Sequence, residues 1–283
     1  MEPYIDAHSH VWTPDTAHYP LAEGFTVADM MPRSFTAEEL LGHCRPAGVG
    51  RVNLIQMSYY RFDNRYMLDM IKLHPERFVG TAIVDPLAAD PGRAMEDLKP
   101  RGVVAFRIQP QYSKLPPSRW LEPPGYEAMF ATAARLGQSL SCLIDPSGFP
   151  EVDRMCRRYP ETKVIIDHIG RIGVDGQVRD ADVVALCDLA VHPRVSVKIG
   201  AFYALGKKSP PYLDLAPLIR RIVQAFGTRR CMWESDCPFQ VDNHRYEDSI
   251  ALVRDRLDFL SPDDRQWLLG RTAEYVLGFP KPN

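Results

Sequence analysis

Short hydrophobic runs recur along the whole chain, and each is followed by a longer segment whose hydrophobic residues have a helical period. The short runs contain many β-branched and aromatic residues and few polar ones, as expected for parallel strands buried on both faces. We predict eight strands, in chain order Tyr4–His8, Val52–Met57, Phe78–Val84, Val103–Ile108, Leu140–Ile144, Lys163–Asp167, Val195–Ile199 and Cys231–Trp233.

The segments between these runs carry signals of helix ends. Thr36 begins the pattern of a capping box, and Gly137 follows the periodic segment Tyr126–Leu136. Eight strands alternating with helices are the arrangement of a (β/α)8 TIM barrel, so we predict this α/β fold, as a single domain over residues 1–283. An open doubly wound sheet is the alternative, but no glycine-rich phosphate loop follows the first strand.

Two segments are longer than the repeat of strand and helix requires. Val11–Ser34 contains three prolines and two aspartates, and Pro110–Pro124 is also rich in proline. Both follow predicted strands, so they belong to the end of a barrel that binds ligands. We expect both to shape the substrate site and to border one pocket with the histidines described below; a surface insertion is the alternative.

Composition narrows the range of partners. The net charge is -2 and no run of Lys or Arg stands out, which argues against nucleic acid and membrane surfaces. The first residues lack a signal-peptide pattern, and no segment has the roughly 20 apolar residues of a membrane span. Six scattered cysteines without a C-x-x-C pair favour reduced thiols. We expect a cytoplasmic protein with a small-molecule substrate; the sequence is compatible with a homo-oligomer.

The first predicted strand leads into Asp6-Ala-His8-Ser-His10. Residues two apart in an extended chain point to the same side, so both imidazoles should enter the mouth of the barrel. Burying two polar rings there costs free energy unless something binds them, whereas a lone histidine is more often structural. The pair therefore favours a functional site.

Polar residues also end the last three predicted strands. Asp167 and His168 follow the sixth, where a helix cap or an incidental pair is the alternative, and Lys198 ends the seventh, where a solvated charge is the alternative. The eighth leads into Trp233-Glu-Ser-Asp236. Asp236 could cap the next helix, but a carboxylate opposite a histidine pair is suited to activating water as a general base.

These motifs form an ordered set. D-x-H-x-H, D-H-x-G, a lysine and W-x-S-D-x-P follow the first, sixth, seventh and eighth strands between residues 6 and 238. In this combination the chain resembles amidohydrolase-related proteins of family 2, a group with lactonases for pyrone dicarboxylate and sugar lactones, decarboxylases and hydratases. The resemblance implies a distorted (β/α)8 barrel of the metal-dependent hydrolase type, in agreement with the fold predicted above.

The chain departs from the metal-dependent relatives at two strand ends. Those relatives place a metal-binding histidine or a carboxylated lysine at the fourth or fifth strand, where this chain has Arg107 and Asp145. A catalytic zinc keeps three protein ligands and an open position, while the lactonase branch includes enzymes that work without metal. We therefore expect one divalent ion, zinc first, or none. The candidate ligands are His8, His10 and Asp236, with His168 or Asp145 assisting.

Arginines near the positions of Arg107 and Arg171 hold substrate carboxylates in the lactonase branch, a task that suits the bidentate guanidinium group. The resemblance implies that role for both, with Lys198 also positioning anionic groups; a surface ion pair is the alternative for each arginine.

Our first hypothesis is hydrolysis of a carboxylated or sugar-derived lactone. Asp236 would deprotonate water, while His8, His10 and His168, or a metal that they hold, would polarise the carbonyl group. A zinc-dependent decarboxylase or amide hydrolase on the same barrel is the second hypothesis. A catalytically silent barrel that binds a ligand is the third.

Overall fold

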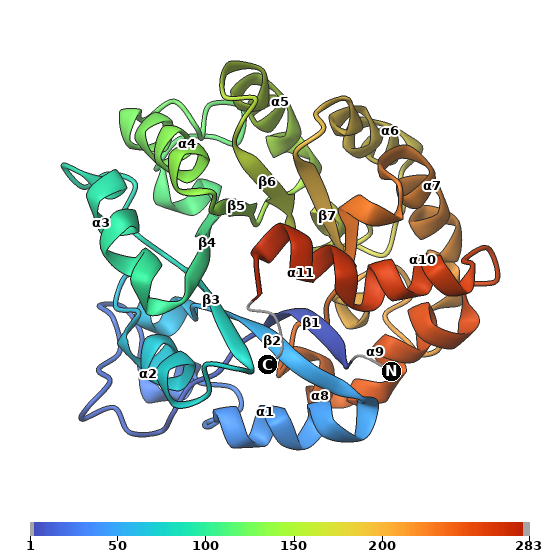
Figure 1. The fold of residues 1–283 in the computed structure, drawn as a ribbon, viewed down its shortest axis with the longest axis horizontal. Coiled ribbons are helices and arrows are strands. Elements are labelled where there is room, and N and C mark those ends of the chain that lie inside the picture. The colour runs from blue at the N-terminus through green and yellow to red at the C-terminus, as the bar shows by residue number, and fades with distance from the viewer. Residues whose placement is uncertain (1–2, 280–283) are drawn as a thin grey trace.

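The computed structural model describes residues 3–279 and shows a barrel of parallel strands surrounded by helices (Figure 1). The eight strands pair in chain order, each parallel to the next. This confirms the predicted (β/α)8 fold and excludes the open doubly wound sheet. The strands are β1 (Tyr4–Ser9), β2 (Val49–Ile55), β3 (Phe78–Ala82), β4 (Val103–Ile108), β5 (Ser139–Cys142), β6 (Lys163–Ile166), β7 (Val195–Ile199) and β8 (Cys231–Trp233).

A helix follows each strand, and further helices complete the chain. Thr36 caps the first of them, because its side chain accepts from Glu39 N while Glu39 Oε2 accepts from Thr36 N. Gly137 ends the fourth in the left-handed conformation that glycine tolerates. The helices are α1 (Ala37–Cys44), α2 (Arg65–Leu73), α3 (Pro91–Leu98), α4 (Pro124–Leu136), α5 (Phe149–Arg158), α6 (Asp180–Asp188), α7 (Ala216–Phe226), α8 (Phe239–Asn243), α9 (Tyr246–Ala251), α10 (Pro262–Gln266) and α11 (Thr272–Leu277).

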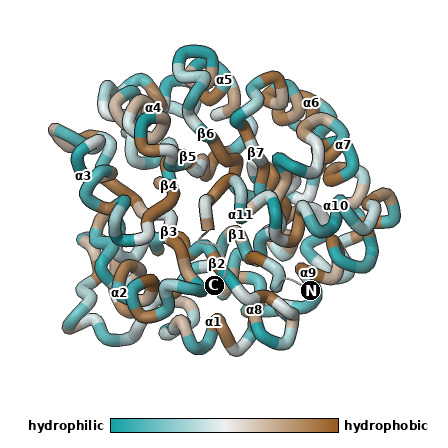
Figure 2. The backbone as a smooth tube through the Cα atoms, in the orientation of Figure 1, coloured by the Kyte–Doolittle hydropathy of each residue, from teal (hydrophilic) through white to brown (hydrophobic). Residues whose placement is uncertain are grey.

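Two hydrophobic clusters hold the barrel together. The larger lies between the strands and the surrounding helices. The smaller fills the barrel interior, where Ile5, Ala105, Ile165 and Met232 of the strands form one cluster with Leu277 of α11. Figure 1 shows α11 across the centre of the ring, and in Figure 2 the hydrophobic colour is strong along β4, β6 and β7. Because α11 covers the amino end of the barrel, the carboxyl end is the one available for a ligand. No helix within residues 3–279 is long and apolar enough to cross a bilayer.

The barrel closes where β8 meets β1. Ser9 and Cys237 form an isolated parallel bridge, with His10 N donating to Cys237 O at 2.7 Å and Asp236 N donating to His8 O at 2.9 Å. The closure thus brings the two histidines and the aspartate predicted from the sequence to one point.

Asp6 fixes this closure from within the wall. Its buried carboxylate accepts hydrogen bonds from Ser9 Oγ at 2.8 Å, Ser235 N at 2.9 Å, Ser235 Oγ at 2.6 Å and Tyr246 Oη at 2.8 Å, and also from His8 N at 3.1 Å. Burial raises the pKa of Asp6, and the donors around it oppose that shift. One carboxylate therefore joins the first strand, the last strand and α9.

We predict that Asp6→Ala lowers the free energy of unfolding by about 3 kcal/mol or more, because several buried donors lose their acceptor at once. Chemical denaturation measures the loss. Asp263→Ala is the control, since this carboxylate is 68% exposed in its pair with Arg271; its effect should stay within about 0.5 kcal/mol. A loss below about 1 kcal/mol for Asp6→Ala would contradict the role of Asp6 in closing the barrel.

Candidate active site

A cavity of about 280 Å³ opens at the carboxyl end of the barrel. Its polar walls come from the ends of several strands, and its apolar walls come from the connections after β5, β6, β7 and β8. The polar lining residues are His10, Arg107, His168, Arg171, Tyr203 and Asp236; the apolar ones are Leu143, Val174, Ala201, Ala204, Leu205 and Phe239.

The histidine pair and Asp236 face one another beside this cavity. His8 Nε2 and His10 Nε2 are 3.2 Å apart, and Asp236 Oδ1 lies 3.5 Å from the first and 3.4 Å from the second. His10 Nδ1 lies 3.0 Å from the carbonyl oxygen of Ile55, which orients the ring so that Nε2 faces the site. Asp236 Oδ2 accepts a hydrogen bond of 2.7 Å from Tyr203 Oη, which fixes the other carboxylate oxygen.

Glu234 holds the third histidine of the site. Its Oε1 lies 2.7 Å from His168 Nδ1 and accepts the backbone N–H of the same residue, while its Oε2 lies 3.1 Å from His8 Nδ1. Gly200 at the end of β7 makes room for this carboxylate, since a Cβ at that position would lie 2.2 Å from Glu234 Cγ. Glu234 therefore orients two imidazoles from the neighbouring strand end.

A lysine and an arginine neutralise the remaining buried carboxylate. Lys198 Nζ lies 2.9 Å from Asp167 Oδ1 with both side chains fully buried, and Arg107 Nε lies 3.4 Å from Asp167 Oδ2. Ser141 Oγ donates to Asp167 at 2.6 Å. Burial opposes ionisation of Asp167, but the Lys198 charge outweighs it and holds the pKa of this carboxyl well below its usual range. Arg107 also places Nη2 2.9 Å from His8 Nε2.

The charge states of the site follow from these contacts. Burial lowers the pKa of His10 to about 4, so this ring is neutral at ordinary pH. Burial also disfavours a charged His168, but the carboxylates of Glu234 and Asp236 outweigh it and raise the pKa of His168. The positive charge near His168 in turn overcomes burial and holds the pKa of Asp236 well below its usual range. Asp236 is thus ionised beside one neutral and one readily protonated imidazole.

The backbone at these strand ends is in an unusual conformation. His168, Arg171, Ala201 and Asp236 have φ of 53°, 56°, 53° and 61°, in the left-handed region that non-glycine residues rarely adopt. Each such residue costs free energy and persists only where the surroundings determine it, a situation that is common at functional sites. The same conformations present the side chains of His168 and Asp236 to the cavity.

The structure gathers most of the residues predicted from the sequence, with two differences. Lys198 does not line the cavity, because its charge is used inside the barrel by Asp167. Asp145 lies on the outer rim, 56% exposed, where its Oδ1 is 3.1 Å from Arg171 Nε. His8, His10, His168 and Asp236 come together, with Arg107 beside them.

Sequence reasoning missed two residues. Glu234 stands inside the motif around Asp236, yet its contact with His168 crosses from β8 to β6, which no local pattern reveals. Tyr203 lies in the connection after β7, in a stretch with no recognisable motif.

The two long connections lie elsewhere on the carboxyl face. They share a hollow of about 510 Å³ that is lined by Phe25 from one and by Gln111, Tyr112 and Lys114 from the other. No residue of either connection lines the cavity beside His10, as far as residues 3–279 show. Both connections lie at the carboxyl end, as predicted, but the expectation that they border the cavity beside His10 is wrong. Pro110, Gln111 and Pro117 instead line a neighbouring cavity that shares Leu143 and Arg171 with it.

The donor set at His8, His10 and Asp236 fits a metal ion. Their three ligand atoms are 3.2 to 3.5 Å apart, the spacing expected of neighbouring ligands around zinc at bond lengths of about 2.0–2.2 Å. Asp236 Oδ1 is buried without a hydrogen-bond donor among the described residues. His8, His168 and Glu234 form a second group of close donors.

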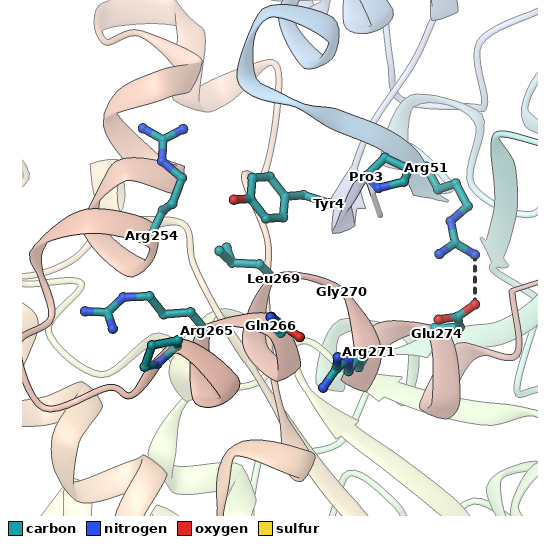
Figure 3. Close-up of a pocket in the computed structure, with 11 residues that line it drawn as sticks. Pro3, Tyr4, Arg51, Arg254, Arg265, Gln266, Leu269, Gly270, Arg271 and Glu274 are labelled. Atoms are coloured by element: carbon teal, nitrogen blue, oxygen red, sulfur yellow. Dashed lines mark hydrogen bonds and ion pairs between the residues drawn. The ribbon is translucent and has the colours of Figure 1, made fainter. Parts of the chain in front are cut away.

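A larger cavity of about 500 Å³ lies at the opposite end of the barrel (Figure 3). It is lined by Tyr4 and by several arginines, two of which pair with carboxylates: Arg51 Nη1 is 3.2 Å from Glu274 Oε1, and Arg271 Nη1 is 2.9 Å from Asp263 Oδ1. The histidine cluster lies at the other end, so we place the active site in the smaller cavity.

A parallel barrel with histidines and an aspartate converging at its carboxyl end is the arrangement of a barrel hydrolase. The amidohydrolase family model matches residues 5–279, so the chain belongs to the amidohydrolase family and is a hydrolase. It is 27% identical to an L-fucono-1,5-lactonase from Burkholderia ambifaria over 99% of this chain and 97% of that protein. It is 27% identical to a 4-sulfomuconolactone hydrolase from Rhizobium radiobacter over 82% of this chain and 75% of that protein.

The fold is also similar to a solved structure of an amidohydrolase from Burkholderia multivorans with bound zinc. The TM-score is 0.82 at 19% identity, and the match covers 98% of this chain and all of the other. At this identity the likeness shows that the two proteins share the barrel fold.

We predict that the two cavity histidines titrate on opposite sides of the ordinary histidine value in chelator-treated protein. His10 should stay neutral down to about pH 4, and His168 should keep its proton to a higher pH than an isolated histidine. NMR titration of ¹⁵N-labelled histidines measures both, with His10→Gln and His168→Gln variants to assign the signals. Glu234→Gln removes a cause of the His168 shift, so the pKa of His168 should fall in that variant. A pKa of His168 unaffected by this change would contradict the electrostatic role given to Glu234.

Proposed function

We propose that this protein is a lactone hydrolase in which Asp236 is the general base. The observation that carries the proposal is the placement of an ionised, buried Asp236 at the cavity wall, within 3.5 Å of His8 and 3.4 Å of His10. The two lactone-opening relatives at 27% identity support this chemistry.

The reaction divides into two steps. Asp236 takes a proton from water as the water oxygen bonds to the lactone carbonyl carbon. Arg107 and His168 stand at the same wall of the cavity and stabilise the negative charge that develops on the carbonyl oxygen. The carbon–oxygen bond of the ring then breaks, and Asp236 returns the proton to the ring oxygen that leaves. The product is an open-chain hydroxy acid.

The other residues of the cluster position these groups. Tyr203 holds Asp236 Oδ2 at 2.7 Å, so that Oδ1 is directed toward the histidines. Glu234 holds His168 at 2.7 Å, and the paired Lys198 and Asp167 lie 3.1 and 3.8 Å from His8 Nδ1. Fixed dipoles and charges of this kind need little rearrangement as the reaction proceeds.

We propose that each chain binds one divalent ion, with zinc as the first candidate, or none. His8, His10 and Asp236 would hold it, and a bound ion would act as a Lewis acid on the carbonyl oxygen or on water. A zinc-dependent decarboxylase or amide hydrolase stays the second candidate, because the same donors would serve it.

The location and the domain organisation are also proposals. The free cysteines support a cytoplasmic location. We propose that residues 1–283 form one catalytic domain.

We predict that Asp236→Asn folds normally and loses about 10²- to 10⁴-fold in kcat/KM on a hydrolysed lactone, because the amide keeps the shape but cannot accept the proton. Circular dichroism and thermal unfolding check the fold, and a pH-indicator assay measures hydrolysis. A variant that keeps more than about a tenth of the wild-type rate would show that another group is the base.

We predict at most one divalent ion per chain when the purified protein is analysed for metals. Arg107 stands at the fourth strand end, where a bridging lysine or histidine would be needed for a second ion. Elemental analysis and anomalous scattering at His8 and His10 provide the measurement. Two ions about 3.5–4 Å apart would contradict the prediction. Activity after exhaustive chelation favours the lactonase, and activity restored only by added metal favours the decarboxylase or amide hydrolase.

A further inference from the structure

The charges around the cavity bear on which lactones can enter it. Three cations were predicted to hold anionic substrate groups: Arg107, Arg171 and Lys198. In the structure each of the three is already engaged by a carboxylate of the chain, Asp167 for two of them and Asp145 for the third.

The two inner cations are committed to the barrel. Lys198 is fully buried, 2.9 Å from Asp167, and also lies 3.2 Å from Ser141 Oγ. Arg107 is 8% exposed and directs its groups at Asp167 and His8. Moving either away from Asp167 would weaken the compensation of a fully buried carboxylate, which is unfavourable. Lys198 does not line the cavity. Arg107 does, but its guanidinium is held by Asp167 and His8 and faces the lactone carbonyl in the proposed reaction, so neither cation is available for a separate substrate carboxylate.

The outer cation is neutralised at the rim. Arg171 lines both the catalytic cavity and a neighbouring cavity of about 240 Å³, and Asp145 lines the second of these. The Arg171 and Asp145 side chains are 40% and 56% exposed, with Nε and Oδ1 3.1 Å apart. The backbone of Asp145 is held in the turn that opens α5, where its carbonyl oxygen accepts from Gly148 N at 2.9 Å, and this keeps the residue next to Arg171. An anion that reached Arg171 would meet Asp145 beside it.

The inner wall adds to the same effect. The buried cluster combines Arg107, Lys198 and the readily protonated His168 with the three carboxylates of Asp167, Glu234 and Asp236, so it has no surplus positive charge to offer an anion. Asp236 itself lines the cavity, so a substrate carboxylate would approach a like charge there. The cavity volume, about 280 Å³, lies just under the usual range for ligand sites and suits a single small ring.

We infer that the lactone opened here carries no anionic substituent and is a neutral, hydroxylated lactone of the sugar-derived kind. We further infer that Asp145 sets this preference by occupying Arg171. The remaining N–H groups of Arg171 and the Tyr203 hydroxyl can hydrogen-bond ring hydroxyls without requiring a counter-charge. This inference rests on the proposed lactone hydrolase and names its substrate class.

The test compares a matched pair of lactones that differ in charge. D-galactono-1,4-lactone and D-galactaro-1,4-lactone share one ring, and the hydroxymethyl group of the first is a carboxylate in the second. L-fucono-1,5-lactone is included as a neutral lactone with a six-membered ring. We expect kcat/KM on the neutral lactones to exceed that on the carboxylated one by about 100-fold, because the carboxylate meets Asp236 and Asp145 without a free cation. Asp145→Asn should raise the ratio of carboxylated to neutral kcat/KM about 10-fold, mainly through a lower KM for the carboxylated lactone.

Asp263→Asn is the matched control, because Asp263 pairs with Arg271 at the opposite end of the barrel with similar exposure. This control should leave the ratio unchanged. A wild-type preference for the carboxylated lactone would overturn the inference while the lactone hydrolase stands. A ratio that Asp145→Asn does not move would overturn the role of Asp145. If the protein opens none of these lactones, and none of a broader panel of neutral and carboxylated lactones, the proposed function itself is overturned.

Discussion

Three carboxylates and two basic side chains are buried together at the carboxyl end of the barrel, and this burial constrains everything around them. Asp167, Glu234 and Asp236 are removed from water together with Arg107 and Lys198. An isolated buried charge is so costly that each must be met by an opposite charge or a hydrogen-bond donor. The ion pair between Lys198 and Asp167 lies at the centre of this arrangement, since Asp167 also binds Arg107 and Ser141. Groups held in this way are preorganised for charge that develops in a reaction.

The same balance affects any metal at the histidine pair. Arg107 Nη2 lies 2.9 Å from His8 Nε2, the nitrogen that would also bind an ion with His10 and Asp236. A divalent ion would thus share its surroundings with a guanidinium group that Asp167 holds in place. The carboxylates of Glu234 and Asp236 offset part of the repulsion. The residue at the fourth strand end therefore affects metal affinity in this barrel together with the three donors.

Periodicity made most of the fold predictable, whereas contacts between distant strands did not show in the sequence. The predicted bounds of β4, β7 and β8 agree with the structure, because each begins and ends on a hydrophobic residue next to a clear change of pattern. β2 begins three residues before the prediction, since Gly50 and Arg51 interrupt its hydrophobic pattern. The pairing of His8 with His10 followed from their spacing. The partner of Lys198 did not, because a buried lysine cannot be told from a solvated one until its carboxylate is located on another strand. Glu234 was missed for the same reason.

Two ion pairs affect the charge that a substrate meets, and substitutions in them differ in their effect on stability. The pair of Lys198 with Asp167 is fully buried, so replacing one member removes the main opposite charge of the other and threatens the barrel. The pair of Arg171 with Asp145 is exposed at the rim and contributes about 0–1 kcal/mol, as surface pairs do. Substitution at residue 145 can therefore alter the charge presented to a ligand while the catalytic cluster and the fold persist. The charges that stabilise the fold thus lie inside the barrel. The charge that a ligand meets lies at the rim, on Asp145, which can be replaced without disturbing them.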